Sequence, residues 1–569
     1  YAIGNVSIEG GGVKLTGSSL ELSVEDNIGV IPNASFSYSL ESSSNIFSNK
    51  MRGKAKVIFL EGEDKKRLQN ASITSCAAGQ DDWFIKASEI EINDTSKIIT
   101  AKNAKLELKG VPIFYSPLLN FSFNDDRKSG FLTPSLGTTS RSGLESSIPY
   151  YFNLSPTSDA TITPRYFGKR GLQMQGEYRY LNKTYSGTNN LEYMNKDSAT
   201  DKANRYYAKI YHKQNLTENI SGGLRVEKVS DDNYFSDMSS LISSTSKVNL
   251  PQEAYLNYST DKLNINFIAQ RYQNLTTTSS PYERLPSLSI NHSDEYENFN
   301  GFSSFETGLG MSLTQFERNH NFVASSTDKN ITGTRFVVNP SISVPFEKSY
   351  GYVKPKLMMN LRKYELEGGS TNSKSMAIPT LSVDSGMYLD KKLDFAGQAF
   401  TQTLEPRIFY SYTPYKNQEA LPMFDTALTD LNLESLFIEN QFVGSDRIMD
   451  SNQFTIAATT RFIDNKGLER LNATLAQRYY MSDRKVLKEA QYANSVIQSD
   501  SSDLFLTATA YLNKALRVNG AIQYNPDESS TNRATFKASY SPHPGKLIDA
   551  SYRLIRNPVD INNDIKQIN

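Results

Sequence analysis

The stretch LFLTATAYL, residues 504–512, decides the fold of this chain. Its Leu and Ala side chains fall at every second position, and Phe, Thr and Tyr occupy the positions between them. Successive side chains of a β-strand point to opposite faces, so the stretch predicts a strand with one apolar face. A strand of about 9–11 residues, when tilted, is long enough to cross the hydrocarbon core of a bilayer.

The same alternation recurs over residues 263–270, 518–524 and 534–541, where the intervening residues are mostly Thr, Ser, Asn, Gln and Lys. A soluble β-sandwich also alternates, but its strands are only about 5–6 residues long. Its apolar positions are also seldom so often Ala, Gly or Tyr. We therefore predict an all-β fold that contains a large antiparallel transmembrane β-barrel with a polar lumen.

The length of the chain sets the expected size of this barrel. At roughly 20–22 residues per strand with its turn, the ~440 residues from residue 128 onward hold about 20 strands, within the range of outer-membrane barrels. Residues 229–250 and 482–503 are polar and predict loops. Residues 412–450 also predict a loop, but its prolines and aromatic residues suggest that it folds over or into the lumen.

The amino-acid composition agrees with strands in which apolar and polar residues alternate rather than with a large apolar core. Hydrophobic residues make up 38% of the 569 residues, yet 33 are Tyr and 29 are Phe. Disordered chains are poor in aromatic residues, so disorder does not explain the low apolar share. The formal net charge is zero, which gives no indication of a nucleic-acid partner. No run approaches the ~18–20 apolar residues of a transmembrane helix, so membrane crossing would require a closed barrel.

The first 115 residues have a different sequence pattern, which is typical of short stacked strands. Three segments, residues 19–22, 89–92 and 105–108, repeat one alternating pattern of apolar and polar residues. We expect the apolar members to face inward in a small two-sheet structure and the glutamates to face water; these apolar residues are Leu20, Leu22, Ile90, Ile92, Leu106 and Leu108. The proline-containing segment 110–117 has no alternation, and we predict domains at 1–115 and 128–569 joined by a junction at 116–127.

Catalytic and metal-binding patterns are not found. The four histidines are scattered and form neither an HExxH motif nor a cluster with cysteine. No glycine-rich phosphate loop follows a strand, and no GxSxG elbow occurs. The acidic pair Asp125-Asp126 precedes Arg127-Lys128, which favours a solvated turn with local charge pairing over a catalytic site. We predict that the chain is not an enzyme and that it needs no metal or cofactor.

Several ordered motifs resemble the LptD family of lipopolysaccharide-assembly proteins. The resemblance extends over nearly the whole chain and is carried by VPIFYSP at 111–117, DDRKSGFLTP at 125–134, IPYY at 148–151, DATITPRY at 159–166, KRG at 169–171, QTLEPR at 402–407 and SDR at 445–447. It implies a barrel of 26 strands in the outer membrane of a Gram-negative cell, preceded by a periplasmic β-jellyroll. It also implies an LptE-type lipoprotein that plugs the lumen and an LptA-type bridge protein at the N-terminal jellyroll.

The resemblance also implies a route for the transported molecule. Lipopolysaccharide acyl chains would pass along the jellyroll groove, and the molecule would leave into the outer-membrane lipids by a lateral gate between the first and last strands. Pro134 and Pro149 match the gate prolines of the family, and Pro164 matches in the next strand segment. Proline donates no hydrogen bond and weakens a ladder, although prolines at strand ends also simply mark turns or protect edges.

The jellyroll residues have two interpretations that the sequence leaves open. The six inward residues named above form either a plain core or a slot for acyl chains. Cys76 is read from its spacing as a buried free thiol, and the resemblance makes it the jellyroll cysteine of a family disulfide whose partner cysteines are absent here. We expect from this that the jellyroll is incomplete at its start and the barrel incomplete at its end.

Other functions compete with lipopolysaccharide transport. A porin-like or TonB-dependent transporter of small solutes is the main alternative, but a TonB-dependent receptor would begin with a compact plug of mixed structure. An outer-membrane enzyme is disfavoured by the missing motifs. A soluble adhesin built from β-sandwiches is a further alternative.

Overall fold

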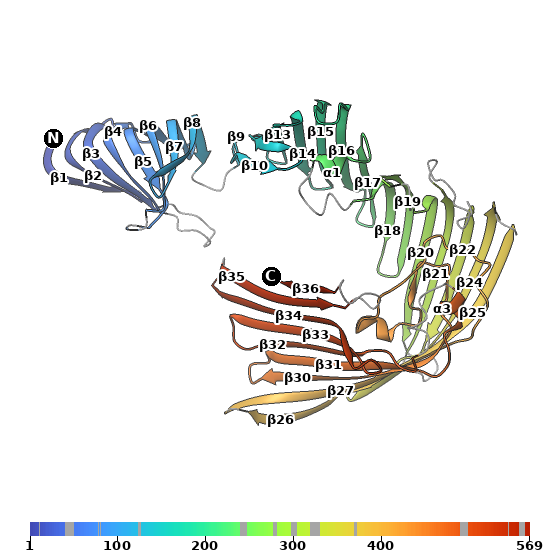
Figure 1. The fold of residues 1–569 in the computed structure, drawn as a ribbon. Coiled ribbons are helices and arrows are strands. Elements are labelled where there is room, and N and C mark those ends of the chain that lie inside the picture. Colours follow the sequence, from blue (N-terminus) through green and yellow to red (C-terminus); the bar gives the residue numbers. More distant parts are fainter. Residues whose placement is uncertain are drawn as a thin grey trace. The chain divides into compact units, whose positions relative to one another are not determined.

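The computed structural model is built almost entirely from antiparallel strands (Figure 1). It describes residues 1–10, 12–39, 50–77, 79, 81–122, 127–238, 247–276, 281–297, 304–318, 331–368, 372–395, 397–489, 499–543, 546–556 and 564–569. The chain divides into two compact units, residues 1–211 with 229–245 and residues 212–228 with 246–569. Within the described residues, no helix combines the length and the apolar character needed to cross a membrane.

The first sheet contains eight strands, which lie side by side in chain order (Figure 1). They are β1 Ala2–Gly10, β2 Val13–Ser23, β3 Ile28–Ser39, β4 Lys50–Glu61, β5 Lys65–Thr74, β6 Trp83–Asn93, β7 Ile98–Leu108 and β8 Val111–Ser122. The segment 111–117, which has no alternation in the sequence, is part of β8, the last strand of this sheet. The domain limits drawn from the sequence stay a prediction.

A row of asparagines kinks the strands of the first sheet at one height. Asn33, Asn70 and Asn103 have φ angles of 47°, 45° and 50°, a left-handed conformation that asparagine tolerates better than most residues. They lie on β3, β5 and β7, and a buried alanine follows each of them: Ala34, Ala71 and Ala104. The kink lets the residues on both sides of it face the same interior.

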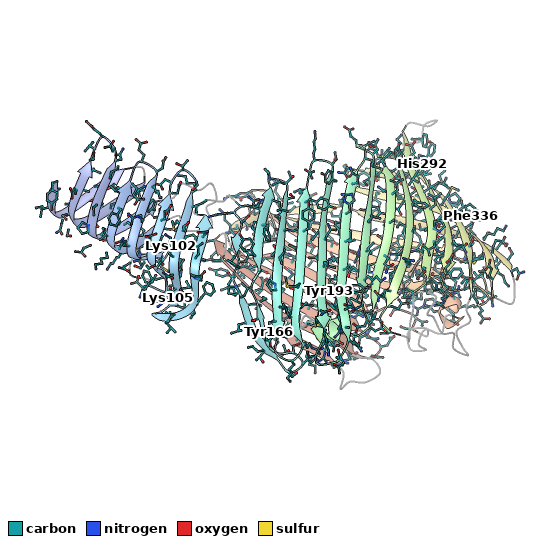
Figure 2. All side chains as sticks on the ribbon, turned by 90° about the horizontal axis from the view of Figure 1, so that it is seen from above. Lys102, Lys105, Tyr166, Tyr193, His292 and Phe336 are labelled. Atoms are coloured by element: carbon teal, nitrogen blue, oxygen red, sulfur yellow. The ribbon has the colours of Figure 1, made fainter. Side chains whose placement is uncertain are left out.

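Burial along β3 illustrates this effect. Ile31 is buried before the kink, and Phe36 and Tyr38 are buried after it, so the alternation skips one residue at Asn33. The apolar interior that results includes Ile58, Leu68, Ile90, Ile92 and Ile99, each at most 1% exposed. On the outer face, Lys102 (Figure 2) donates a hydrogen bond to Glu89 at 2.6 Å, which lowers the pKa of that carboxyl.

The second sheet contains 26 strands. It begins with β9 Gly130–Phe131, β10 Ser135–Thr139, β11 Gly143–Ser147, β12 Tyr150–Ser155, β13 Ser158–Phe167, β14 Gly171–Leu181, β15 Tyr185–Lys196, β16 Ala203–Asn215 and β17 Ile220–Val229. It continues with β18 Asn249–Ser259, β19 Leu263–Asn274, β20 Glu283–Glu297, β21 Ser304–Glu317, β22 Thr332–Ser343, β23 Phe346–Lys348, β24 Gly351–Glu367, β25 Ser373–Met387, β26 Leu389–Phe395 and β27 Gln398–Thr413.

Its remaining strands are β30 Ser451–Asp464, β31 Glu469–Tyr480, β32 Leu504–Tyr511, β33 Leu516–Asn525, β34 Ser530–His543, β35 Lys546–Ile555 and β36 Ile565–Ile568. The small elements between strands are α1 Tyr234–Met238, α3 Lys485–Glu489, the 3-10 helix η1 Glu434–Phe437 and a separate pair, β28 Ala427–Leu428 with β29 Phe442–Val443. The strands predicted around 504–512, 518–524 and 534–541 are confirmed as β32, β33 and β34. The predicted loops at 229–250 and 482–503 contain α1 and α3, although residues 239–246 and 490–498 of them lie outside the described part of the chain.

The sheet contains more strands than the approximately 20 that we expected, because four strands are each broken into two pieces. β22 and β23 pair with the same strand, β24, on either side of Val344 and Pro345. The pieces β25 and β26 likewise share β27 as a partner. The other two breaks, β9 from β10 and β11 from β12, contain prolines and are described below. Counting each broken pair once reduces 26 by four to 22.

The two faces of this sheet differ in polarity, as the alternation predicted. Large apolar side chains lie directly opposite one another on five consecutive strands, β18 to β22, and are 36–47% exposed; these residues are Leu256, Phe267, Leu288, Leu313 and Phe336, the last of which is labelled in Figure 2. The opposite face contains buried polar residues such as Gln270 and Arg335. A continuous exposed apolar band on a sheet is typical of contact with lipid.

The long segment between β27 and β30 folds onto the polar face, which confirms the expectation for residues 412–450. Asp446 is fully buried there and accepts a hydrogen bond from Arg335 Nη1 on β22 at 2.6 Å. The same carboxylate accepts the backbone N–H groups of Phe424 and Asp425 at 2.7 and 3.0 Å. Tyr364 on β24 donates to it at 3.2 Å. One carboxylate thus joins the segment to two strands of the sheet.

We expect replacement of Asp446 by alanine to destabilise the folded chain, because Arg335 would keep only Asp425 as an ion-pair partner and the N–H groups of Phe424 and Asp425 would lose their acceptor. Removing one member of a buried ion pair costs about 3–5 kcal/mol. A urea titration followed by heat-modifiable gel mobility would measure the change in the unfolding midpoint. Lys363→Ala is the matched control, since Lys363 and its partner Glu365 are 60% and 56% exposed and such pairs contribute about 0–1 kcal/mol. Equal midpoints for the two variants would contradict the prediction.

Candidate functional site: the proline-interrupted start of the second sheet

The first strands of the second sheet are interrupted at the two prolines that the resemblance singled out. Pro134 lies in the gap between β9 and β10, and Pro149 lies in the gap between β11 and β12. Across the first gap, Phe131 pairs with Tyr150 and Ser135 with Ser147. Three residues on one side therefore face two on the other, which is the mismatch of a β-bulge.

Proline also reduces the number of hydrogen bonds that the gap can contain. Neither Pro134 nor Pro149 has an N–H group to donate. Across this part of the sheet, the Leu132 N–H donates to Pro149 O at 2.9 Å and the Ile148 N–H donates to Pro164 O at 3.2 Å. Pro164 stays within β13, paired with Met174, and does not break its strand. The pairing around Pro134 and Pro149 therefore contains fewer hydrogen bonds than an unbroken stretch of the sheet.

Apolar side chains cover the outside of this region. Phe131, Leu136 and Ile148 are 61%, 77% and 52% exposed. The ring of Tyr150 contacts the rings of Phe131 and Phe152, with centroids 4.9 and 4.7 Å apart. On the strands that follow, the exposed aromatic residues Tyr166 and Tyr193 continue the apolar face (Figure 2).

A polar cluster beside the prolines was missed by the sequence analysis. Asp159 on β13 is 5% exposed and is surrounded by Arg127, Arg179 and Tyr151. The sequence suggested that Arg127 would pair with the acidic residues next to it, but its ion pair in the structure is with Asp159, 32 residues later. The acidic pair itself lies outside the described residues. No local pattern would have indicated a contact over that separation.

The six candidate lipid-groove residues do not share one environment. Ile90 and Ile92 are fully buried in the core of the first sheet, and Leu20 packs partly buried against that core. Leu22 and Leu106 are half-buried. Leu108, the last residue of β7, is 48% exposed although it is paired with Trp83 on β6 and Val111 on β8.

Cys76 follows β5 and is a half-buried free thiol. The Thr74 side chain forms a hydrogen bond with it that lowers the pKa of the thiol. Arg52 Nε donates to the Cys76 carbonyl oxygen at 2.9 Å, which fixes the backbone there. The chain contains one cysteine, so the thiol has no partner for a disulfide within residues 1–569.

Metal ligands are not gathered at any of these places. Within the part of the chain that the structure describes, no group of three or more His, Cys, Asp or Glu side chains is arranged to hold a metal ion.

Solved outer-membrane proteins resemble the chain only weakly. Pseudomonas aeruginosa OccK11 (OpdR) is 10% identical, with a TM-score of 0.25 over 62% of this chain and 89% of that one. The alcaligin outer-membrane receptor FauA from Bordetella pertussis is 9% identical, with a TM-score of 0.25 over 82% of this chain and 79% of that one. At these scores neither protein bears on function.

Sequence comparison is far more specific. The family model described as "LPS transport system D" matches residues 203–569, and one described as "LptD protein" matches residues 99–297. A protein of Aromatoleum aromaticum named LPS-assembly protein LptD is 34% identical over 98% of this chain and 70% of its own length. One of the same name from Nitrosomonas eutropha is 34% identical over 98% of this chain and 75% of its own length. The chain therefore belongs to the LptD family.

Proposed function

We propose that this protein transports lipopolysaccharide and assembles it into the outer leaflet of the outer membrane. The observation that carries the proposal is the 34% identity to LPS-assembly proteins over 98% of the chain. The exposed apolar band on the large sheet supports a position in lipid, because soluble proteins seldom expose apolar patches of that extent. The small-solute transporter alternative has no comparable support, and we assign the chain no catalytic step.

The interrupted strands support a lateral exit. Lipopolysaccharide has acyl chains that must enter the lipid and sugars that must stay in water, so an exit through a side seam lets each part remain in its preferred surroundings. Pro134 and Pro149 are the natural candidates for weakening such a seam, because each removes one backbone donor from the first strands. The seam in this proposal lies between the first and last strands of the barrel.

The eight-stranded sheet supports a periplasmic groove for the acyl chains. Its most buried residues, Ile90 and Ile92, are tightly packed core, so we propose that the acyl chains contact Leu22, Leu106 and Leu108 instead. Leu22 and Leu106 are half-buried and Leu108 is exposed, whereas Leu20, also half-buried, packs against the core. In the same proposal, a plug lipoprotein of the LptE type contacts the polar face of the large sheet, and a bridge protein of the LptA type contacts the N-terminal sheet.

Replacing Pro134 and Pro149 together by threonine should slow the arrival of lipopolysaccharide at the cell surface. Each restored backbone donor would contribute about 0.5–1.5 kcal/mol to the pairing among the first strands, and stiffer first strands bend away from the last strand less often. Surface lipopolysaccharide would be measured by pulse labelling in cells that depend on the variant. Pro345→Thr is the control, since Pro345 lies in the β22–β23 gap, far along the sheet. An unchanged rate in the double variant would contradict the gate role.

Photo-crosslinking residues placed in the first sheet should distinguish groove from core. We expect lipopolysaccharide adducts at Leu106 and Leu108 and none at Ile90, because a side chain that is 0% exposed has no room beside it for an acyl chain. Ile113 on the outer face, 57% exposed, serves as a control for non-specific capture of lipid. Adducts of equal yield at Ile90 and Leu108 would show that the acyl chains enter the core itself.

A further inference from the structure

The Asp159 carboxylate accepts hydrogen bonds from three side chains. Its Oδ1 accepts from Arg179 Nε at 2.8 Å. Its Oδ2 accepts from Arg179 Nη2 at 3.1 Å, from Arg127 Nη1 at 2.9 Å and from the Tyr151 hydroxyl at 3.2 Å. Hydrogen bonds between ionised partners are about twice as strong as neutral ones. A carboxylate with so many donors, only 5% exposed, is firmly held on β13.

Arg127, which forms an ion pair with this carboxylate, also contacts the end of β12. Its Nη2 donates to the carbonyl oxygens of Ser155 and Pro156 at 3.0 and 2.5 Å. Its own carbonyl oxygen accepts from Asn153 Nδ2 at 2.7 Å. Two residues later, Ser129 Oγ accepts the Asn153 backbone N–H at 2.8 Å. Residues 127–129 are thus fastened to the end of β12 by side chains, before any strand pairing begins.

The strand that follows has little pairing of its own. β9 consists of Gly130 and Phe131, which pair with Tyr151 and Tyr150. The bulge at Pro134 comes directly after it. An isolated pair of such short strands is not stable by itself. The side-chain hydrogen bonds around Asp159 therefore stabilise the short β9–β12 pairing.

We propose that Asp159 is a positioning residue that keeps residues 127–132 on β12 while lipopolysaccharide leaves. The β9–β12 pairing then stays closed during export, and the first strand moves together with β12 and β13 rather than peeling away from them. This inference rests on the proposed function, and it specifies which pairing next to the gate prolines does not open.

A disulfide across the pairing tests the proposal. Phe131 and Tyr150 are directly opposite partners, so Phe131→Cys with Tyr150→Cys can be crosslinked and the bond verified by thiol alkylation and mass spectrometry. We expect surface lipopolysaccharide to arrive at the same rate in the crosslinked double variant as in each single-cysteine variant. A crosslink that stops export, with recovery on reduction, would show that this pairing must open and would overturn the proposal.

The second test removes the anchor. Asp159→Asn should slow lipopolysaccharide arrival several-fold while the amount of heat-modifiable folded protein stays the same, and the Phe131–Tyr150 crosslink should restore the rate. Asp294→Asn is the matched control, because Asp294 pairs with Lys262 at 2.7 Å beside a turn elsewhere in the sheet. Failure of the crosslink to restore export in folded Asp159→Asn protein would assign Asp159 a different role and overturn the proposal.

Different results would contradict the proposed transport function and the positioning role of Asp159. If depletion of the wild-type protein leaves lipopolysaccharide arrival unchanged, the proposed function is wrong. If depletion stops arrival but the crosslink also stops it, the function holds and the positioning role of Asp159 is wrong. If Asp159→Asn lowers the amount of folded protein, the crosslink in the otherwise unchanged chain still decides whether the pairing opens.

Discussion

Backbone hydrogen bonding within the sheet is the constraint on which the rest of this structure depends. An unpaired N–H or C=O group in lipid costs several kcal/mol, so a membrane sheet has to be paired along its whole length. The start of the second sheet departs from that rule at Pro134 and Pro149. Charged side chains around Asp159 hold the chain immediately beside the departure. Weak backbone pairing and strong side-chain bonding are thus placed next to each other.

The strands were largely predictable from the sequence, but their continuity was not. Alternation located β32, β33 and β34 and correctly assigned an apolar face to the sheet, because side-chain direction follows directly from position along a strand. The breaks depend on the neighbouring strand. Pro164 and Pro345 look alike in sequence, yet Pro164 stays paired within β13, whereas Pro345 lies in a gap between two pieces.

The site was predictable only where a motif marked it. The prolines were found by resemblance to the family, whereas Asp159 and Arg127 are brought together by folding across 32 residues, with no signal in either local sequence. The exposure of Leu108 could not be predicted for another physical reason. A period of two residues determines the face of a strand but does not say how far a side chain on that face is covered.

The asparagine row in the first sheet has a consequence for how such a sheet can change in length. Asn33, Asn70 and Asn103 follow one another at intervals of 37 and 33 residues, each with its buried alanine, and each interval corresponds to two strands. A duplicated hairpin with this Asn–Ala pair would meet its neighbours at the same height. The eight-stranded sheet could therefore gain or lose strands in pairs during evolution, as solenoid proteins gain or lose repeats, with its cross-section unchanged.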